Sequence, residues 1–215
     1  MRKLLILCAL MMGIAVQPAT AQTDKKAKEL LDAAYKKLNN LKALKADFSL
    51  ELKGGGVNDK KKGTFYMKGT KYRVSIAGQE IISDNKTVWT IIKATNEVQV
   101  TDYNPDAQSI SPAKLFTSNF YDKEYTYKYA GERKINGKAA DIIALTPKSG
   151  DKMFTKVEIA IGKDKVIMGG QVWEKNGNTY RYDITNYSPN PPSVTDATFT
   201  FDPKKNPGME VIDLR

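Results

Sequence analysis

Residues 24–52 read DKKAKELLDAAYKKLNNLKALKADFSLEL, and this stretch contains the change of pattern that decides the fold. In its first part, apolar residues recur every three or four positions, as they do on one face of an α-helix. They are Leu30, Leu31, Ala34, Tyr35, Leu38 and Leu41. We therefore predict a helix over residues 24–41, capped by Thr23 or Asp24, whose apolar stripe must lie against another apolar surface.

After this helix the period changes to two residues, which is typical of half-buried strands. Phe48, Leu50 and Leu52 alternate with polar residues, and similar short segments follow along the chain. After this first strand we expect strands at residues 64–68, 71–76, 79–83, 87–92, 97–101, 125–132, 139–146, 155–161, 166–174, 179–187 and 199–201. Such short strands, separated by hairpin turns such as Asn136-Gly137, predict a mainly β, α+β fold with an antiparallel sheet or barrel of about eleven strands.

One segment in the middle of the chain interrupts the strands. Ser111 suits the N-cap and Pro112 the first turn of a short helix. Leu115 and Phe116 then supply apolar side chains with which this helix can anchor itself.

The first 21 residues have the pattern of a secretory signal peptide. Arg2 and Lys3 precede an apolar stretch over residues 4–16, and Ala19-Thr20-Ala21 matches a small-residue cleavage site. The stretch is shorter than the roughly 20 apolar residues that span a membrane, which argues against an uncleaved anchor. Cys8 lies too early in the stretch for a lipidated cysteine. We predict cleavage after Ala21 and one exported soluble domain over residues 22–215, with no membrane-spanning segment.

Composition excludes much chemistry. The chain of 215 residues has no histidine, and its only cysteine is Cys8, inside the predicted signal peptide. Histidine-dependent catalysis, Cys/His zinc sites and disulfides are therefore excluded from the exported domain, and no cofactor or metal site is expected. The charge balance of 34 Lys+Arg against 24 Asp+Glu is basic, but no nucleic-acid-binding motif accompanies it.

Two further features have structural explanations. Ser111 to Lys114 matches the S-x-x-K motif of penicillin-recognising serine enzymes, and Ser83-Asp84-Asn85 matches their S-D-N motif, but the order is reversed and no K-T-G follows. We therefore expect no catalytic residues. Tyr125, Tyr127 and Tyr129 share one face of a strand, as do Tyr180 and Tyr182 on another, and ordinary half-buried tyrosines explain them better than a ligand-binding aromatic face.

The order of these segments resembles the LolA family of periplasmic outer-membrane lipoprotein carriers. The resemblance covers nearly all of residues 22–215, and each matching piece is short. The pieces are LKALKADF at 41–48, GTFYMK at 63–68, ISDNKTVW at 82–89, PAKLF at 112–116, FTFDP at 199–203 and VID at 211–213.

The resemblance implies an unclosed antiparallel β-barrel with a helical lid over an apolar concave face that takes acyl chains. Strand alternation would direct Phe48, Leu50, Tyr72, Val74, Trp89 and Ile91 onto this face. The lid would contribute Leu31, Ala34, Tyr35, Leu38, Leu115 and Phe116.

The chain departs from the family at the second strand. The family has an arginine that tethers the lid, followed by a proline, whereas Lys68 here precedes Gly69-Thr70. Arg73 is the nearest candidate for a lid tether, although strand alternation directs it to the opposite face from Tyr72 and Val74. The closure of the lid is therefore expected to depend more on apolar contacts.

The leading functional hypothesis is a monomeric, non-enzymatic periplasmic carrier that shields the acyl chains of lipoproteins and moves them from the inner to the outer membrane. The partners implied by the resemblance are acylated lipoproteins, a lipoprotein-releasing ABC transporter and, where one exists, an outer-membrane acceptor. The alternatives are a LolA-like module that senses lipid or lipoprotein in envelope regulation or surface assembly, and a hydrolase that uses carboxylates or Ser111.

Overall fold

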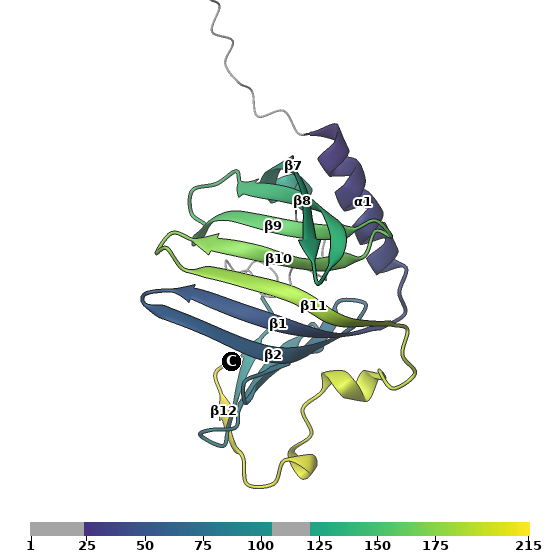
Figure 1. Cartoon of the computed structure of the whole chain (residues 1–215). Helices are drawn as coiled ribbons and strands as arrows, with labels where there is room; N and C mark the ends of the chain where they lie inside the picture. The colour runs from purple at the N-terminus through teal and green to yellow at the C-terminus, as the bar shows by residue number, and fades with distance from the viewer. Residues whose placement is uncertain (1–23, 105–120) are drawn as a thin grey trace, which may run out of the picture.

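The computed structural model describes residues 24–104 and 121–215, which form one large sheet with a long helix packed against it (Figure 1). The strands are β1 (Leu44–Gly54), β2 (Val57–Lys68), β3 (Lys71–Ile76), β4 (Gln79–Ser83), β5 (Thr87–Ile92), β6 (Glu97–Asp102), β7 (Tyr125–Ile135), β8 (Lys138–Pro147), β9 (Phe154–Gly162), β10 (Ile167–Glu174), β11 (Thr179–Pro189) and β12 (Glu210–Asp213). The helices are α1 (Lys25–Asn39) and the short α3 (Tyr121–Glu124), with 3₁₀ turns at Asp196–Phe199 and Pro203–Lys205.

The order of the strands shows that the sheet does not close. It runs β12-β6-β5-β4-β3-β2-β1-β11-β10-β9-β8-β7, so β12 and β7 are the two edges. Every neighbouring pair is antiparallel except β12 with β6. Strand β1 joins two consecutive meanders, because it pairs with β2 on one side and with β11 on the other. The predicted mainly β fold with an unclosed antiparallel sheet is confirmed, with twelve strands in the described residues.

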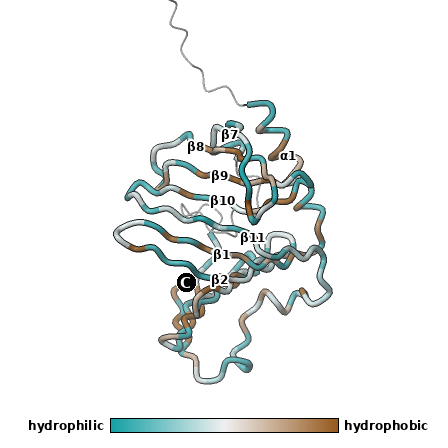
Figure 2. Tube along the Cα trace, viewed as in Figure 1, coloured by the Kyte–Doolittle hydropathy of each residue, from teal (hydrophilic) through white to brown (hydrophobic). Residues whose placement is uncertain are grey.

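The register defines two faces of the sheet. Residues directly opposite each other on paired strands point to the same side. We call the side against which α1 packs the inner face and the opposite side the outer face. Hydrophobic stretches run along strands such as β8 and β9, and more hydrophilic turns connect them (Figure 2).

Helix α1 is confirmed, with its predicted apolar stripe turned inward. Asp24 is the N-cap, and its side chain accepts a hydrogen bond from the backbone N–H of Ala27 at 3.2 Å. Leu30, Leu31, Ala34, Tyr35 and Leu38 are all buried. Since a short amphipathic helix gains most of its stability from packing, this contact with the sheet holds α1 together.

The hairpin of β1 and β2 is longer than expected. We predicted that the second strand begins at residue 64, but β2 begins at Val57 and pairs with β1 along its whole length. The extra residues are mostly polar and lysine-rich, so the apolar alternation does not reveal them. Cross-strand charge pairing supports them instead, since Glu51 lies 3.8 Å from Lys60 on the paired strand.

The predicted strand at residues 199–201 is wrong. Phe199 ends a 3₁₀ turn and is fully buried with Ala43 and Val194, whereas Phe201 packs on a different apolar cluster. These two side chains fix the segment onto the outer face without backbone pairing. The last strand is β12, which covers the edge of β6 in parallel orientation.

Two predicted features lie outside the described residues. They are the signal peptide at residues 1–21 and the short helix that begins at Ser111. Among the described residues, neither α1 nor α3 is long and apolar enough to cross a membrane.

Gly63 provides a test of the packing between β1 and β2. A Cβ atom at this position would lie 2.5 Å from the ring of Phe48 and 2.7 Å from the carbonyl oxygen of Ser75. We expect Gly63→Ala to lower the free energy of unfolding by about 1–3 kcal/mol, because neither the ring nor the backbone can withdraw freely. Urea denaturation measures this, with Gly150→Ala as the control because the space around Gly150 is open. Equal stability of the two variants would contradict the packing described.

Candidate functional site

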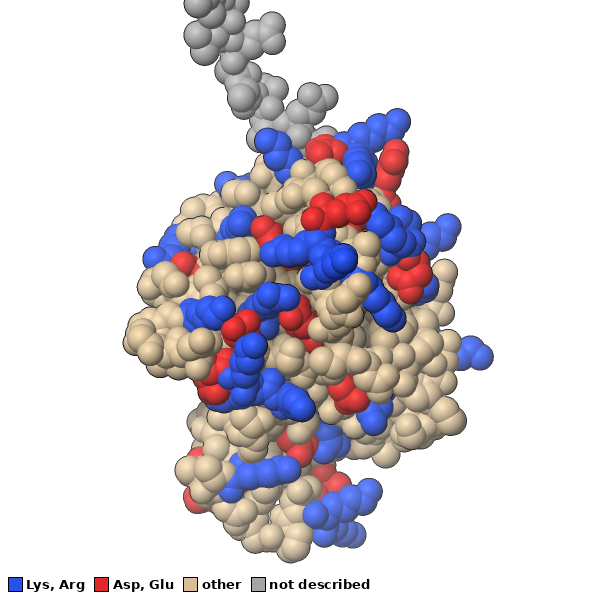
Figure 3. Space-filling view, in the orientation of Figure 1, with Lys and Arg blue, Asp and Glu red and all other residues tan. Residues whose placement is uncertain are grey.

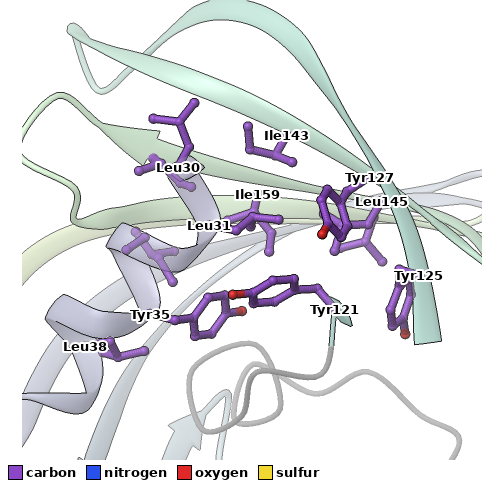
Figure 4. Close-up of a cluster of buried hydrophobic side chains, with 14 of the residues drawn as sticks. Leu30, Leu31, Tyr35, Leu38, Tyr121, Tyr125, Tyr127, Ile143, Leu145 and Ile159 are labelled. Carbon is purple, nitrogen blue, oxygen red and sulfur yellow. The ribbon is translucent and has the colours of Figure 1, made fainter. Parts of the chain in front are cut away.

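The inner face carries the largest apolar cluster of the molecule's described part. Helix α1 contributes Leu30, Leu31, Tyr35 and Leu38, and these meet side chains from β7, β8 and β9 and from Tyr121 of α3 (Figure 4). The rings of Tyr35 and Tyr121 lie 5.1 Å apart, and Tyr121 meets Tyr127 edge-on at 5.8 Å. The helix therefore covers the half of the sheet formed by β7 to β9.

Most of the predicted cavity residues meet in this cluster. Phe48 and Val74 are buried in it together with Leu31, Ala34, Tyr35 and Leu38. Leu50 and Tyr72 are half-buried and pack against it. Strands β1 and β3 thus direct the expected side chains onto the face that α1 covers. Leu115 and Phe116, the expected contribution of the second helix, lie outside the described residues.

Trp89 and Ile91 do not join this cluster, contrary to our prediction. Trp89 pairs with Ile82, which pairs with Arg73, and this row of side chains belongs to the outer face. There Trp89 and Ile91 pack in a second cluster with the buried Ile82, Val98 and Val100. The C-terminal segment covers that cluster through Phe201 and Met209. Val88 and Ile92 of β5 point to the other face, so alternation alone cannot assign the faces of this strand.

Arg73 also lies on the outer face, away from α1. Its guanidinium forms an ion pair with Glu80 and donates a hydrogen bond to the carbonyl oxygen of Thr198 at 3.5 Å. Lys93 binds the same Glu80 carboxylate at 3.1 Å. Arg73 therefore ties the C-terminal segment to the sheet, and the suggested role as a lid tether does not fit its position.

Tyrosines dominate the inner face more than the sequence indicated. Nine of the eleven tyrosines belong to the cluster or pack against it: Tyr35, Tyr72, Tyr121, Tyr125, Tyr127, Tyr129, Tyr180, Tyr182 and Tyr187. Burial raises the pKa of the Tyr182 hydroxyl to about 12. The pKa of Tyr127 is also raised to about 12, by burial and by its hydrogen bond to Asp122. These hydroxyls therefore stay neutral at physiological pH and add polar groups to an otherwise apolar surface.

A polar cluster joins α1 to α3 and β7. Lys28 lies 3.1 Å from Asp32 on its own helix and 3.3 Å from Asp122 of α3. Tyr121 donates a hydrogen bond to Asp32 at 2.7 Å, and Tyr127 donates one to Asp122 at 2.8 Å. We call these five residues the helix lock.

Further polar contacts hold the two ends of α1. At its start, the Asp24 carboxylate accepts a hydrogen bond from the backbone N–H of Tyr129 at 3.0 Å, and the Lys26 ammonium lies 3.4 Å from the centre of the Tyr129 ring. Near its end, Lys37 donates to the carbonyl oxygen of Asp164 at 2.7 Å.

Sequence reasoning missed both these end contacts and the helix lock, because their partners are up to 127 residues apart. The only available signal was the i,i+4 spacing of Lys28 and Asp32. Closure of the helix over the sheet thus depends on directed polar contacts as well as on apolar ones.

The inner face of β1, β3 and β11 is less completely covered. Leu50, Tyr72, Ile76, Tyr180 and Tyr182 are only half-buried there. This surface offers contact to an apolar ligand and hydroxyl groups to its polar atoms. On the opposite side of the sheet, Lys and Arg are interspersed with Asp and Glu (Figure 3), in pairs such as Arg181 with Asp183. In the described residues no cluster of carboxylates could hold a metal ion.

The described residues thus form an unclosed sheet whose apolar inner face is partly covered by a helix. The family model for the outer membrane lipoprotein carrier protein LolA matches residues 39–202, so the chain belongs to the LolA family.

Two relatives agree with this assignment, and one solved structure shares the fold. An outer-membrane lipoprotein carrier protein of Klebsiella pneumoniae is 28% identical over the full length of both chains. A protein of the same name from Histophilus somni is 28% identical over 83% of this chain and 85% of its own length. A crystal structure of an uncharacterised conserved protein from Thermus thermophilus is similar in fold, with a TM-score of 0.59 at 15% identity, over 88% of this chain and 99% of that one.

We expect the helix lock to make the stability of the folded protein depend on pH. Hydrogen bonding from Tyr127 and the nearby Lys28 ammonium lower the pKa of Asp122. A lowered pKa in the folded state stabilises the protein above the unfolded pKa of about 4, and this stabilisation is lost as the pH falls through the folded value. We expect Asp122→Asn to lower the melting temperature at pH 6 and to make no difference near pH 2.

Thermal melts between pH 2 and pH 7 measure this effect. Glu29→Gln on α1 is the control, because Glu29 is exposed and forms only an ion pair at 3.9 Å with the exposed Lys25. A constant difference between wild type and Asp122→Asn at every pH would show that the charge of Asp122 is not involved.

Proposed function

We propose that the protein is a periplasmic carrier that shields the acyl chains of lipoproteins on its inner face and moves them from the inner to the outer membrane. The observation that carries the proposal is the half-buried apolar surface of β1, β3 and β11 beside a helix-covered cluster, in a chain of the LolA family. A 16-carbon acyl chain in water costs roughly 12 kcal/mol, so a carrier must cover it and still release it.

The proposal includes the route of the protein and its partners. Residues 1–21 serve as a cleaved signal peptide, and residues 22–215 act in the periplasm as a monomer without enzymatic activity. A lipoprotein-releasing ABC transporter of the inner membrane supplies the cargo, and an outer-membrane acceptor, where one exists, takes it.

The second candidate is a LolA-like module that senses lipid or lipoprotein. It is favoured by one observation: the half of the inner face under α1 is filled by side chains, with Tyr35 and Tyr121 in ring contact. Native mass spectrometry of protein purified from the periplasm separates the candidates. A carrier retains intact lipoprotein and passes it to acceptor membranes, whereas a sensor binds the lipid or lipoprotein without transfer.

Leu50 tests the ligand surface directly. Leu50→Glu places a carboxylate on the inner face, where it must lose hydration whenever an acyl chain covers it. We expect binding of a palmitoylated peptide to weaken by at least tenfold, about 1.4 kcal/mol. Val57→Glu, at an exposed position of the same hairpin, should bind like wild type in a titration by isothermal calorimetry. If both variants bind like wild type, the ligand does not contact β1.

Tryptophan fluorescence tests which face the ligand contacts. The two tryptophans, Trp89 and Trp173, lie on the outer face, so the palmitoylated peptide should leave wild-type emission nearly unchanged. A Tyr182→Trp variant places the reporter on the inner face beside Phe48, and its emission should shift to shorter wavelength as water is displaced. Arg181→Trp is the matched control, since neighbouring strand residues point to opposite faces. Equal shifts in both variants would rule out binding confined to the inner face.

A further inference from the structure

A cavity, which we call the slot, opens where two strands of the sheet separate. It has a volume of about 760 Å³ and lies between the start of β10 and the end of β11, near the C-terminal end of α1, where Lys37 binds Asp164 of its lining. Its apolar lining comes from Val166, Ile167, Met168 and Ile184, and Ala139 and Lys138 of β8 form part of its rim. The volume is within the range of about 300–1,000 Å³ that is usual for ligand sites.

Two irregularities of the sheet create this slot. The register of β10 against β9 shifts between Ile167 and Gly169, and that of β11 against β1 shifts around Thr185. Pairing of β10 with β11 begins at Gly169, where a Cβ atom would lie only 2.2 Å from the carbonyl oxygen of Tyr182. Before this point β10 diverges from β11. Such bulges bend the strand, change the direction of its side chains and often lie next to functional sites.

The slot leaves one strand edge open. Ile184, Asn186 and Tyr187 of β11 pair with β1 on one side, and on the side of the slot no described strand pairs with residues 184–187. The carbonyl oxygen of Ile184 instead accepts a hydrogen bond from the side-chain amide of Asn136 at 2.8 Å. The Asn136 amide thus occupies one acceptor of this edge, and a backbone N–H of an added strand would have to take its place.

The slot is continuous with the inner face. Ile167 is buried in the main apolar cluster while it also lines the slot. Ile184 and Tyr187 line the slot and pack against the same cluster. A molecule with an apolar part and a polypeptide part could therefore occupy both places at once.

We propose that the slot binds the extended polypeptide next to the lipid anchor of the cargo, as a strand added to β11. This proposal rests on the lipoprotein-carrier function proposed above and specifies how its cargo is held. Main-chain hydrogen bonds supply affinity in strand addition without reading sequence. A carrier that must accept many different lipoproteins gains a contact that all of them can make.

Two palmitoylated peptides test the proposal with the mature protein. One continues from the lipid as Thr-Val-Thr-Val-Thr, and in the other both valines are replaced by proline, which removes two backbone donors and disfavours strand pairing. We expect the first peptide to bind about tenfold more tightly, and only this peptide should slow amide hydrogen exchange at residues 184–187.

Paired variants assign the difference to the slot. Ala139→Trp places a large ring at the exposed rim and should abolish the preference for the first peptide. Ala94→Trp, at an exposed turn far from the slot in the strand order, should keep it. Both proteins remain testable through their binding of the proline peptide.

The affinities of the two peptides and the protection of residues 184–187 distinguish strand addition from lipid binding alone. Equal affinity of the two peptides, or protection of residues 184–187 by neither of them, would overturn strand addition and leave lipid binding intact. If neither peptide binds at all, the carrier function is wrong and the slot proposal falls with it. A preference that survives in Ala139→Trp would place the added strand elsewhere.

Discussion

The contact between the apolar stripe of α1 and the inner face is the interaction on which the architecture depends. A sheet that does not close exposes one apolar side, and twelve strands expose far more than a soluble protein can leave in water. Helix α1 covers only the half formed by β7 to β9. On the rest of the inner face, side chains of β1, β3 and β11 are only half-buried among the described residues.

Polar contacts determine how that helix is held. Apolar packing has no preferred direction, so a helix held by it alone can slide or tilt. The helix lock, the Asp24 contact with β7 and the Lys37 contact with the β9–β10 turn fix α1 at both ends. Most of these groups remain partly exposed, so each contact contributes little and can be broken at small cost. Together the apolar and polar contacts give α1 a defined position on the sheet.

Helices and turns could be predicted from the sequence more accurately than the face of the sheet to which each side chain points. Local signals identified α1, its Asp24 cap and the hairpin turns, because these depend on neighbouring residues. Alternation placed Phe48, Leu50, Tyr72 and Val74 correctly, since only one side of their strands is apolar. It failed at Trp89 and Ile91 because the C-terminal segment buries the outer side of β5 as well. The helix lock and the slot depend on contacts between distant residues and on bulges, which no local pattern encodes.

The position of β1 has a consequence for the way the chain acquires its structure. Strand β1 is among the first elements to leave a ribosome or a membrane channel, yet its partner β11 ends at Pro189. The two meanders can form as they emerge, because each consists of neighbouring hairpins. The pairing of β1 with β11 that joins the two meanders requires nearly the whole chain to be present. Contacts between such distant segments form slowly. A polypeptide built in this way leaves its central strand pair unformed until its synthesis is almost complete.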